Sequence, residues 1–206
     1  MKKIKVAITG GMGSGKSTAA QYVTSLGYPV FSCDDIYKDI YNSADFQKSL
    51  CQEFSSCIVN GRIDKKLLSA LVFSDKDALK RLNNLSHAKI MAKLNQLMDS
   101  VEGRLVFAEV PLLFETKMES NFNFALVILR NRRDRISSIC SRDGLSEGDA
   151  LARINNQWDY DAKENLDFLK DERFFVIENN SSVEFLKTEI QNFLKSLSRE
   201  TIFGKQ

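Results

Sequence analysis

Short apolar runs alternate along the chain with segments of helical pattern. The apolar runs predict buried strands at residues 3–9, 28–33, 105–110, 124–129 and 174–177. The segments between them predict helices at residues 17–26, 35–41, 44–55, 65–73, 76–97, 132–141, 146–157 and 182–197. Such an alternation is typical of a parallel sheet with helices on both of its faces. We therefore predict an α/β fold with a five-stranded parallel sheet flanked by helices.

Two of the predicted helices carry sequence signals for their first turn. Ser74 and Asp77 have the spacing of a capping box for the helix at 76–97, and Ser181 and Glu184 have that spacing for the last helix. The helix at 76–97 has one apolar face, so we expect it to pack against its neighbours. That face is formed by the residues at positions 79, 82, 85, 90, 94 and 97.

The stretch Gly10–Thr18, with the sequence GGMGSGKST, matches G-x-x-x-x-G-K-[ST] between a predicted strand and a predicted helix. Glycines there let backbone N–H groups surround an oxyanion, and the helix adds the positive end of its dipole. Lys16 is expected to reach the β- and γ-phosphates of a nucleoside triphosphate, and the Ser17 hydroxyl to bind Mg²⁺. The nucleotide-binding candidates are Gly11, Gly13, Ser14, Gly15, Lys16, Ser17 and Thr18.

Acidic residues follow two further predicted strands, at the sheet edge where ligands bind in open parallel sheets. Asp34 and Asp35 follow the second strand, and their position leaves two roles open: a base for a substrate hydroxyl, favoured for Asp34, and a helix cap, favoured for Asp35. Glu109 ends the third strand, where a carboxylate would help to position Mg²⁺; a solvent-facing residue is the alternative. Several arginines follow the fourth strand, and one or two of them are expected to contact phosphate.

Composition narrows the class of partner. The chain has 206 residues, 43% of them hydrophobic, and a formal net charge of +2, so it is expected to form one domain and not to bind nucleic acid. No apolar run is long enough to span a membrane and no signal-peptide pattern opens the chain, so we expect a cytoplasmic protein. Cys33, Cys51, Cys57 and Cys140 lack metal-ligand spacing and are expected to be reduced.

The order of these elements resembles the dephospho-CoA kinase family. The resemblance runs from residue 3 to about residue 197 and includes GGMGSGKST, an Asp after the second strand, VPLLFE at Val110–Glu115 and FVIENN before the last helix. Further similar segments are Gly61–Asp64 (GRID), Val72–Phe73 and the pair Arg153 and Gln157. PLLFE, after a helix that bears the single histidine, is the most specific of these motifs.

The resemblance implies a kinase that transfers the γ-phosphoryl group of ATP to the ribose 3′-hydroxyl of dephospho-CoA, with ATP and Mg²⁺ as cofactors. It implies catalytic roles for Lys16, for Asp34 as the base and for Arg142 on a mobile lid. It also places Asn179 near the adenine, and Glu109 falls where the family usually has an acid; Ser17 and Glu109 are the metal-binding candidates. The residues that it implies for the dephospho-CoA site are Asp34, His87, Leu112, Leu113 and Glu115.

Because a kinase must close over its substrates to exclude water, we expect three parts within the single domain. Its core is expected at residues 1–34, 93–141 and 164–206, a helical acceptor-binding insertion at 35–92 and the lid at 142–163. A monomer or a small homo-oligomer is expected. Where the family commonly has an arginine this chain has Ser138, so Arg135 is the candidate to supply that phosphate contact.

Three other functions remain open at this stage. Another P-loop nucleoside or nucleotide kinase would share the fold and differ in its acceptor. A P-loop ATPase would need stimulation by a partner. A regulatory GTPase would need an N-K-x-D motif, which the sequence lacks.

Overall fold

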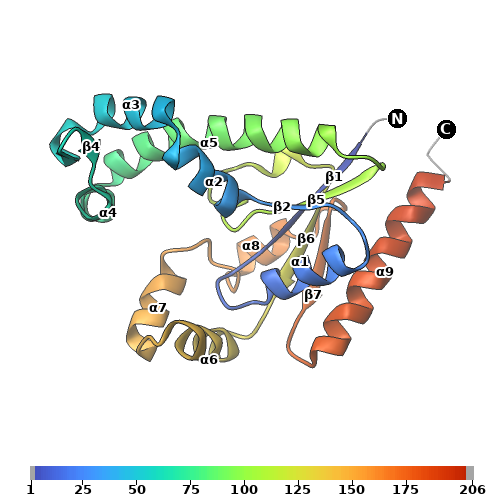
Figure 1. The fold of residues 1–206 in the computed structure, drawn as a ribbon. Helices are drawn as coiled ribbons and strands as arrows, with labels where there is room; N and C mark the ends of the chain where they lie inside the picture. Colours follow the sequence, from blue (N-terminus) through green and yellow to red (C-terminus); the bar gives the residue numbers. More distant parts are fainter. Residues whose placement is uncertain (1–2, 203–206) are drawn as a thin grey trace. The chain divides into compact units, whose positions relative to one another are not determined.

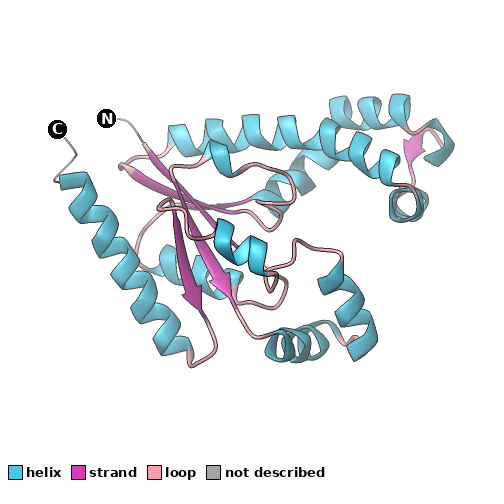
Figure 2. Cartoon of the chain, turned by 180° about the vertical axis from the view of Figure 1, so that it is seen from behind, coloured by secondary structure: helices cyan, strands magenta, loops and turns pink. Residues whose placement is uncertain are grey.

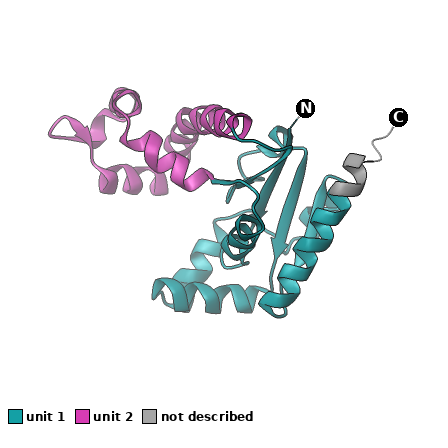
Figure 3. Ribbon diagram, turned by 45° about the vertical axis from the view of Figure 1, so that its right-hand side comes forward, with its two compact units in different colours: residues 1–31, 101–206 teal, residues 32–100 magenta. Residues whose placement is uncertain are grey.

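The computed structural model describes residues 3–202 and divides into two compact units (Figure 3). The first unit contains the described residues up to Phe31 and from Val101 onward, and the second contains Ser32–Ser100. The sequence had placed the insertion at 35–92. Within residues 3–202, no helix combines the length and the apolar composition that a membrane span requires.

A five-stranded parallel sheet forms the first unit's centre (Figures 1 and 2). Its strand order is β2-β5-β1-β6-β7. The strands are β1 (Ile4–Gly10), β2 (Val30–Ser32), β5 (Leu105–Glu109), β6 (Phe124–Leu129) and β7 (Phe174–Glu178), which confirms all five predicted strands to within three residues at each end. Ile8 lies beside Glu109, and Gly10 lies beside Ile128, so the carboxyl ends of three strands meet at one edge.

Helices flank this sheet because their apolar residues complete its core. Val6 and Phe107 from the strands are fully buried against Val23 of α1 and Ile190 of α9. The helices of this unit are α1 (Lys16–Ser25), α6 (Arg132–Asp143), α7 (Glu147–Asn155), α8 (Lys163–Phe168) and α9 (Val183–Ile202), with a 3₁₀ turn at Glu119–Asn121. The short helix α8 was not predicted.

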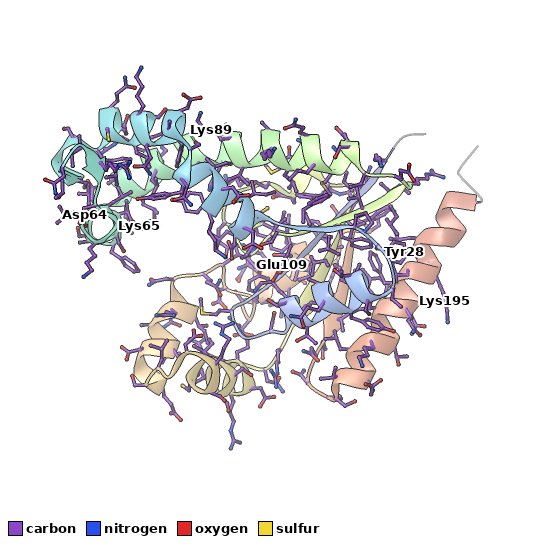
Figure 4. All side chains as sticks on the ribbon, in the orientation of Figure 1. Tyr28, Asp64, Lys65, Lys89, Glu109 and Lys195 are labelled. Carbon is purple, nitrogen blue, oxygen red and sulfur yellow. The ribbon has the colours of Figure 1, made fainter. Side chains whose placement is uncertain are left out.

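The second unit is helical and has a core of its own, around Phe46, Leu50 and Leu68. Its helices are α2 (Cys33–Asn42), α3 (Ala44–Glu53), α4 (Lys65–Ser74) and α5 (Lys76–Ser100), and a 3₁₀ turn lies at Ser55–Cys57. A hairpin that the sequence analysis missed, β3 (Ile58–Val59) and β4 (Arg62–Ile63), turns at Asn60-Gly61. Asp64 caps α4, and Figure 4 labels Asp64 and Lys65 where that helix begins.

Two predicted helix caps in this unit are wrong. The N-cap of α2 is Ser32, whose side chain accepts a hydrogen bond from the N–H of Asp35, so Asp35 lies within the helix. Asp75 Oδ1, and not Ser74, accepts the N–H groups in the first turn of α5, 2.8 Å from the nitrogen of Asp77. Ser74 instead donates to carbonyl groups of the preceding turn of α4, because that helix extends through it.

Two details of the long helices also differ from the prediction. Ser182 Oγ accepts the N–H of Phe185, 3.2 Å away, so Ser182 and not Ser181 caps α9. On α5, Leu79 is exposed, which makes the predicted apolar face partly wrong. The buried positions of α5 are Ala78, Ser86, Ile90, Leu94 and Met98, mostly at spacings of four because the helix packs along a different stripe.

Candidate active site

The loop between β1 and α1 has a backbone that only glycines adopt readily at two positions. Gly13 has φ +76°, and a Cβ there would lie 2.6 Å from the carbonyl oxygen of Arg135. Gly15 has φ +105°, and its Cβ would lie 2.5 Å from Asn179 Nδ2. The N–H of Ser14 donates to Gly11 O across the loop, 3.1 Å away. The glycines therefore let this loop fold tightly against the rest of the unit.

Lys16 and Ser17, the first two residues of α1, direct polar groups toward the carboxyl edge of the sheet. Lys16 Nζ donates to Gly10 O at 2.7 Å and to Gly11 O at 3.0 Å, so the ammonium group lies over the loop. Ser17 Oγ donates to Glu109 Oε1 at 2.9 Å. Figure 4 labels Glu109, which ends β5 next to β1. The structure thus brings Glu109 next to Ser17 of the phosphate loop, from a separate part of the sequence.

The donors at this position suit Mg²⁺. Ser17 and Glu109 offer a hydroxyl and a carboxylate oxygen, the hard ligands that Mg²⁺ prefers. Within residues 3–202 no group of three or more His, Cys, Asp or Glu side chains could hold a metal ion. Mg²⁺ in kinases is usually held by one or two protein ligands together with substrate phosphates and water, so two oxygen donors fit it.

Asn179 lies directly behind the loop. Its side chain is buried, with 9% of its surface exposed, and its Nδ2 donates to Ser14 O at 2.8 Å. Its backbone N–H donates to Leu129 O at the end of β6, also at 2.8 Å. The resemblance placed Asn179 near the adenine of ATP, whereas the contacts of the side chain in this structure are with the phosphate loop.

Arg142 is mostly exposed, in the last turn of α6. Its Nε and Nη2 donate to the carboxylate of Asp143 at 2.7 and 3.0 Å. This hydrogen bond is the main reason why the pKa of Arg142 is raised. Arg153 also contacts Asp143, at 3.4 Å. Both arginines thus share one carboxylate in this structure.

Arg135 is the buried arginine of the site, with 2% of its side chain exposed. Its Nε donates to Met12 O at 3.1 Å, and Asp161 lies 3.7 Å from its Nη1. Burial lowers its pKa. A cavity of about 200 Å³ opens beside it, with Gly11, Ser14, Arg130, Glu178 and Asn180 in its lining. Arg130 Nη1 donates to Ser138 Oγ at 2.8 Å. Arg130 therefore lies next to Ser138, the position where the family commonly has an arginine.

The predicted substrate residues in the loop after β5 differ in their exposure and in their contacts. Leu112 is 44% exposed, whereas Leu113 is completely buried and can contribute only by packing or through its backbone. Glu115 Oε1 accepts the N–H of Trp158 at 2.9 Å, and Glu115 Oε2 is buried without a hydrogen-bond partner. Phe114 packs against Trp158, with ring centroids 4.7 Å apart. Glu115 is therefore attached to Trp158, near the C-terminal end of the predicted lid.

Asp34 and His87 belong to the second unit. Asp34 is exposed in the first turn of α2. His87 is half-buried on α5, and burial lowers its pKa, so its neutral form is favoured. The two residues thus offer a carboxylate and a neutral imidazole.

Residues 157–161, which we call the return segment, carry contacts that the sequence analysis missed. Gln157 Oε1 accepts the N–H of Met12 at 2.6 Å. Tyr160 is 3% exposed, and burial, followed by the nearby Glu115 carboxylate, raises its pKa. Only Gln157 had a signal in the sequence, as the last residue of R-I-N-N-Q, and that pattern gave no partner for it.

Comparisons with known proteins agree on one family. The family model described as dephospho-CoA kinase matches residues 4–184. A dephospho-CoA kinase from Thermus thermophilus is 33% identical over 195 residues, covering 95% of this chain and 92% of the relative. One from Fusobacterium nucleatum is 30% identical over 198 residues, covering 93% and 97%.

Solved structures with a similar fold include a dephospho-CoA kinase. A crystal structure of TT1252 from Thermus thermophilus has a TM-score of 0.80 and 32% identity, and covers 97% of this chain and 98% of its own. Dephospho-CoA kinase from Campylobacter jejuni has a TM-score of 0.65 and 27% identity, covering 96% and 98%. A gluconokinase from Sinorhizobium meliloti, at 12% identity and a TM-score of 0.56, shares the fold alone.

Proposed function

Because this chain belongs to the dephospho-CoA kinase family, we propose that its phosphate loop and its helical unit carry out that family's reaction with the residues described above. The reaction transfers the γ-phosphoryl group of ATP to the ribose 3′-hydroxyl of dephospho-CoA, giving CoA and ADP. It is the last step in the synthesis of coenzyme A. Catalysis of this kind depends mainly on positioning and on stabilisation of charge.

ATP is proposed to bind with its phosphates on the loop Gly10–Thr18. The Lys16 ammonium group already lies over this loop, held by the carbonyl groups of Gly10 and Gly11. Phosphate oxygens would replace those carbonyl groups as its acceptors, and the charge-assisted contact would be the stronger one. The backbone N–H groups at the start of α1 and the helix dipole would add to this attraction.

Ser17 and Glu109 are proposed to be the residues that would hold Mg²⁺. When bound, the ion would neutralise charge on the phosphate oxygens. The protein contributes a hydroxyl and a carboxylate that are already 2.9 Å apart, on a helix and a strand. This pairing of Ser17 with Glu109 is the observation that best supports the proposal, because it places a carboxylate next to a loop built for phosphate.

Asp34 is proposed to accept the proton of the ribose 3′-hydroxyl as that oxygen attacks the γ-phosphorus. A carboxylate can orient the hydroxyl and accept its proton. His87, Leu112 and Glu115 are proposed to contact dephospho-CoA, and Leu113 to support that loop from within the core. Residues 142–163 are proposed to be a lid that closes over the substrates and excludes water, with residues 157–161 as its anchored end and with Arg142 exchanging Asp143 for a phosphate group.

The proposal is tested by ADP release from purified protein with MgATP and a panel of acceptors: dephospho-CoA, adenosine, pantothenate and several nucleoside monophosphates. We expect ADP release with dephospho-CoA and with no other acceptor of the panel, and we expect labelled phosphate on the product. Faster release with a nucleoside monophosphate would instead favour another small-molecule kinase of this fold. ATP turnover that leaves every acceptor unlabelled would refute kinase activity.

A further inference from the structure

Met12 is the residue between Gly11 and Gly13 in the phosphate loop, and side chains hold both of its backbone polar groups. Its N–H donates to Gln157 Oε1 at 2.6 Å, and its carbonyl oxygen accepts from Arg135 Nε at 3.1 Å. These two contacts fix the two peptide groups that flank Met12. The second of them, between Met12 and Gly13, also carries the N–H of Gly13, one of the amides that a phosphate-binding loop directs at its ligand.

The loop also rests on the Arg135 side chain. A Cβ on Gly11 would lie 2.4 Å from Arg135 Nη2, so the guanidinium fills the space beneath that residue. Arg135 Nη2 is buried without a hydrogen-bond partner. Asp161, in the return segment, lies 3.7 Å from Arg135 Nη1. Both supports of Met12 are therefore linked to the return segment: Gln157 belongs to it, and Arg135 is paired with it.

The return segment is in turn attached to the loop after β5. The N–H of Trp158, the residue after Gln157, donates to Glu115 Oε1 at 2.9 Å. The Trp158 ring packs against Phe114 at 4.7 Å and against Tyr160 at 4.8 Å. Tyr160 is nearly completely buried. Packing of this kind fixes the position of Gln157 relative to the sheet.

We infer that Gln157 is a positioning residue for the phosphate loop: it holds the N–H of Met12 so that the backbone of the loop, with the Gly13 N–H that follows, keeps the conformation that binds the phosphates of ATP. This inference rests on the proposed function, in which that loop binds ATP. Gln157 touches the loop and not the reacting atoms. Its loss should therefore weaken the binding of the triphosphate while the acceptor site keeps its residues.

The test compares Gln157→Met with Asn156→Ala in the full-length protein. Methionine keeps the length and approximate volume of glutamine but removes the acceptor for the Met12 N–H. Asn156 is the exposed neighbour of Gln157 and serves as the matched control. For Gln157→Met we expect the KM for ATP to rise about tenfold, because the partly buried Met12 N–H loses its hydrogen-bond acceptor. The KM for dephospho-CoA should change less than twofold, and Asn156→Ala should behave as wild type.

Hydrogen exchange resolved at single amides separates positioning from general loosening. In Gln157→Met, the Met12 amide should exchange about tenfold faster, while amides of the central strands keep their rates. Faster exchange throughout the first unit would mean a structural role and would overturn the inference. An unchanged KM for ATP would overturn it as well. Failure of the wild-type protein to phosphorylate dephospho-CoA would refute the proposed function, whereas the Met12 exchange rate would still test the contact.

Discussion

Replacing Asn179 by alanine should destabilise the first unit by an amount that the structure allows us to estimate. The Asn179 amide donates to Ser14 O at 2.8 Å, and the hydrogen bond is buried. Without it, a buried carbonyl group of the phosphate loop loses its donor, which costs about 2 kcal/mol. For a chain of this length, that loss corresponds to a fall in melting temperature of about 4–8 °C.

Thermal unfolding followed by circular dichroism measures this change, with two further variants as controls. Asn180→Ala removes an exposed acceptor of the Asn131 N–H and should change stability by about 0.5 kcal/mol or less. Asn179→Asp keeps the size of the side chain but puts a carboxylate oxygen in place of the amide donor to Ser14 O. Asn179→Asp should therefore be at least as destabilising as Asn179→Ala. Equal melting temperatures for Asn179→Ala and Asn180→Ala, or wild-type stability of Asn179→Asp, would refute the reasoning.

Three further predictions concern the metal, the base and the histidine. Glu109→Gln should raise the Mg²⁺ concentration that gives half-maximal activity about 10- to 100-fold, measured by titration with MgCl₂ at fixed ATP; an unchanged titration would remove Glu109 from the metal site. Asp34→Asn should lower kcat by a factor of about 10² to 10⁴ in the ADP-release assay, and near-normal turnover at saturating substrates would show that Asp34 is not the base. Because burial lowers the pKa of His87, the unfolded chain takes up a proton first as the pH falls through about 6.5, and stability is lost there. His87→Gln should therefore lose less stability than wild type between about pH 7 and about pH 5 in urea unfolding; equal losses would contradict this cause.

The strands and the phosphate loop were predictable because local sequence determines them. The strand 124–129 is a continuous apolar run, and β6 has the same bounds. The loop GGMGSGKST requires glycines for its own conformation, so its residues identify it without knowledge of their neighbours. The proximity of Ser17 and Glu109 followed less directly, from the rule that ligands collect at the carboxyl ends of parallel strands.

The hairpin at Asn60-Gly61 was missed although its turn has a local signal. Both residues have positive φ, +51° and +76°, and Asn-Gly is the sequence that such a turn favours. The strands on either side have only two residues each, too short for their alternation to be recognised. The misplaced caps have a similar cause, because adjacent polar residues such as Ser74 and Asp75 compete for one position and the packing of the helices decides between them.

The contacts of the return segment could not be predicted, because they join residues far apart in the sequence. Gln157 and Met12 are separated by 145 positions, and Trp158 and Glu115 by 43. The second contact changes how experiments on Glu115 must be interpreted. The resemblance implied that Glu115 lines the dephospho-CoA site, yet one of its oxygens holds the backbone N–H of Trp158. A variant that removes the carboxylate would therefore disturb the return segment, and through Gln157 the phosphate loop, even if Glu115 never touched substrate. Loss of activity in Glu115→Ala is therefore evidence for a substrate contact only if the KM for ATP stays unchanged. The loss of a contact with the acceptor alone would leave the nucleotide site intact.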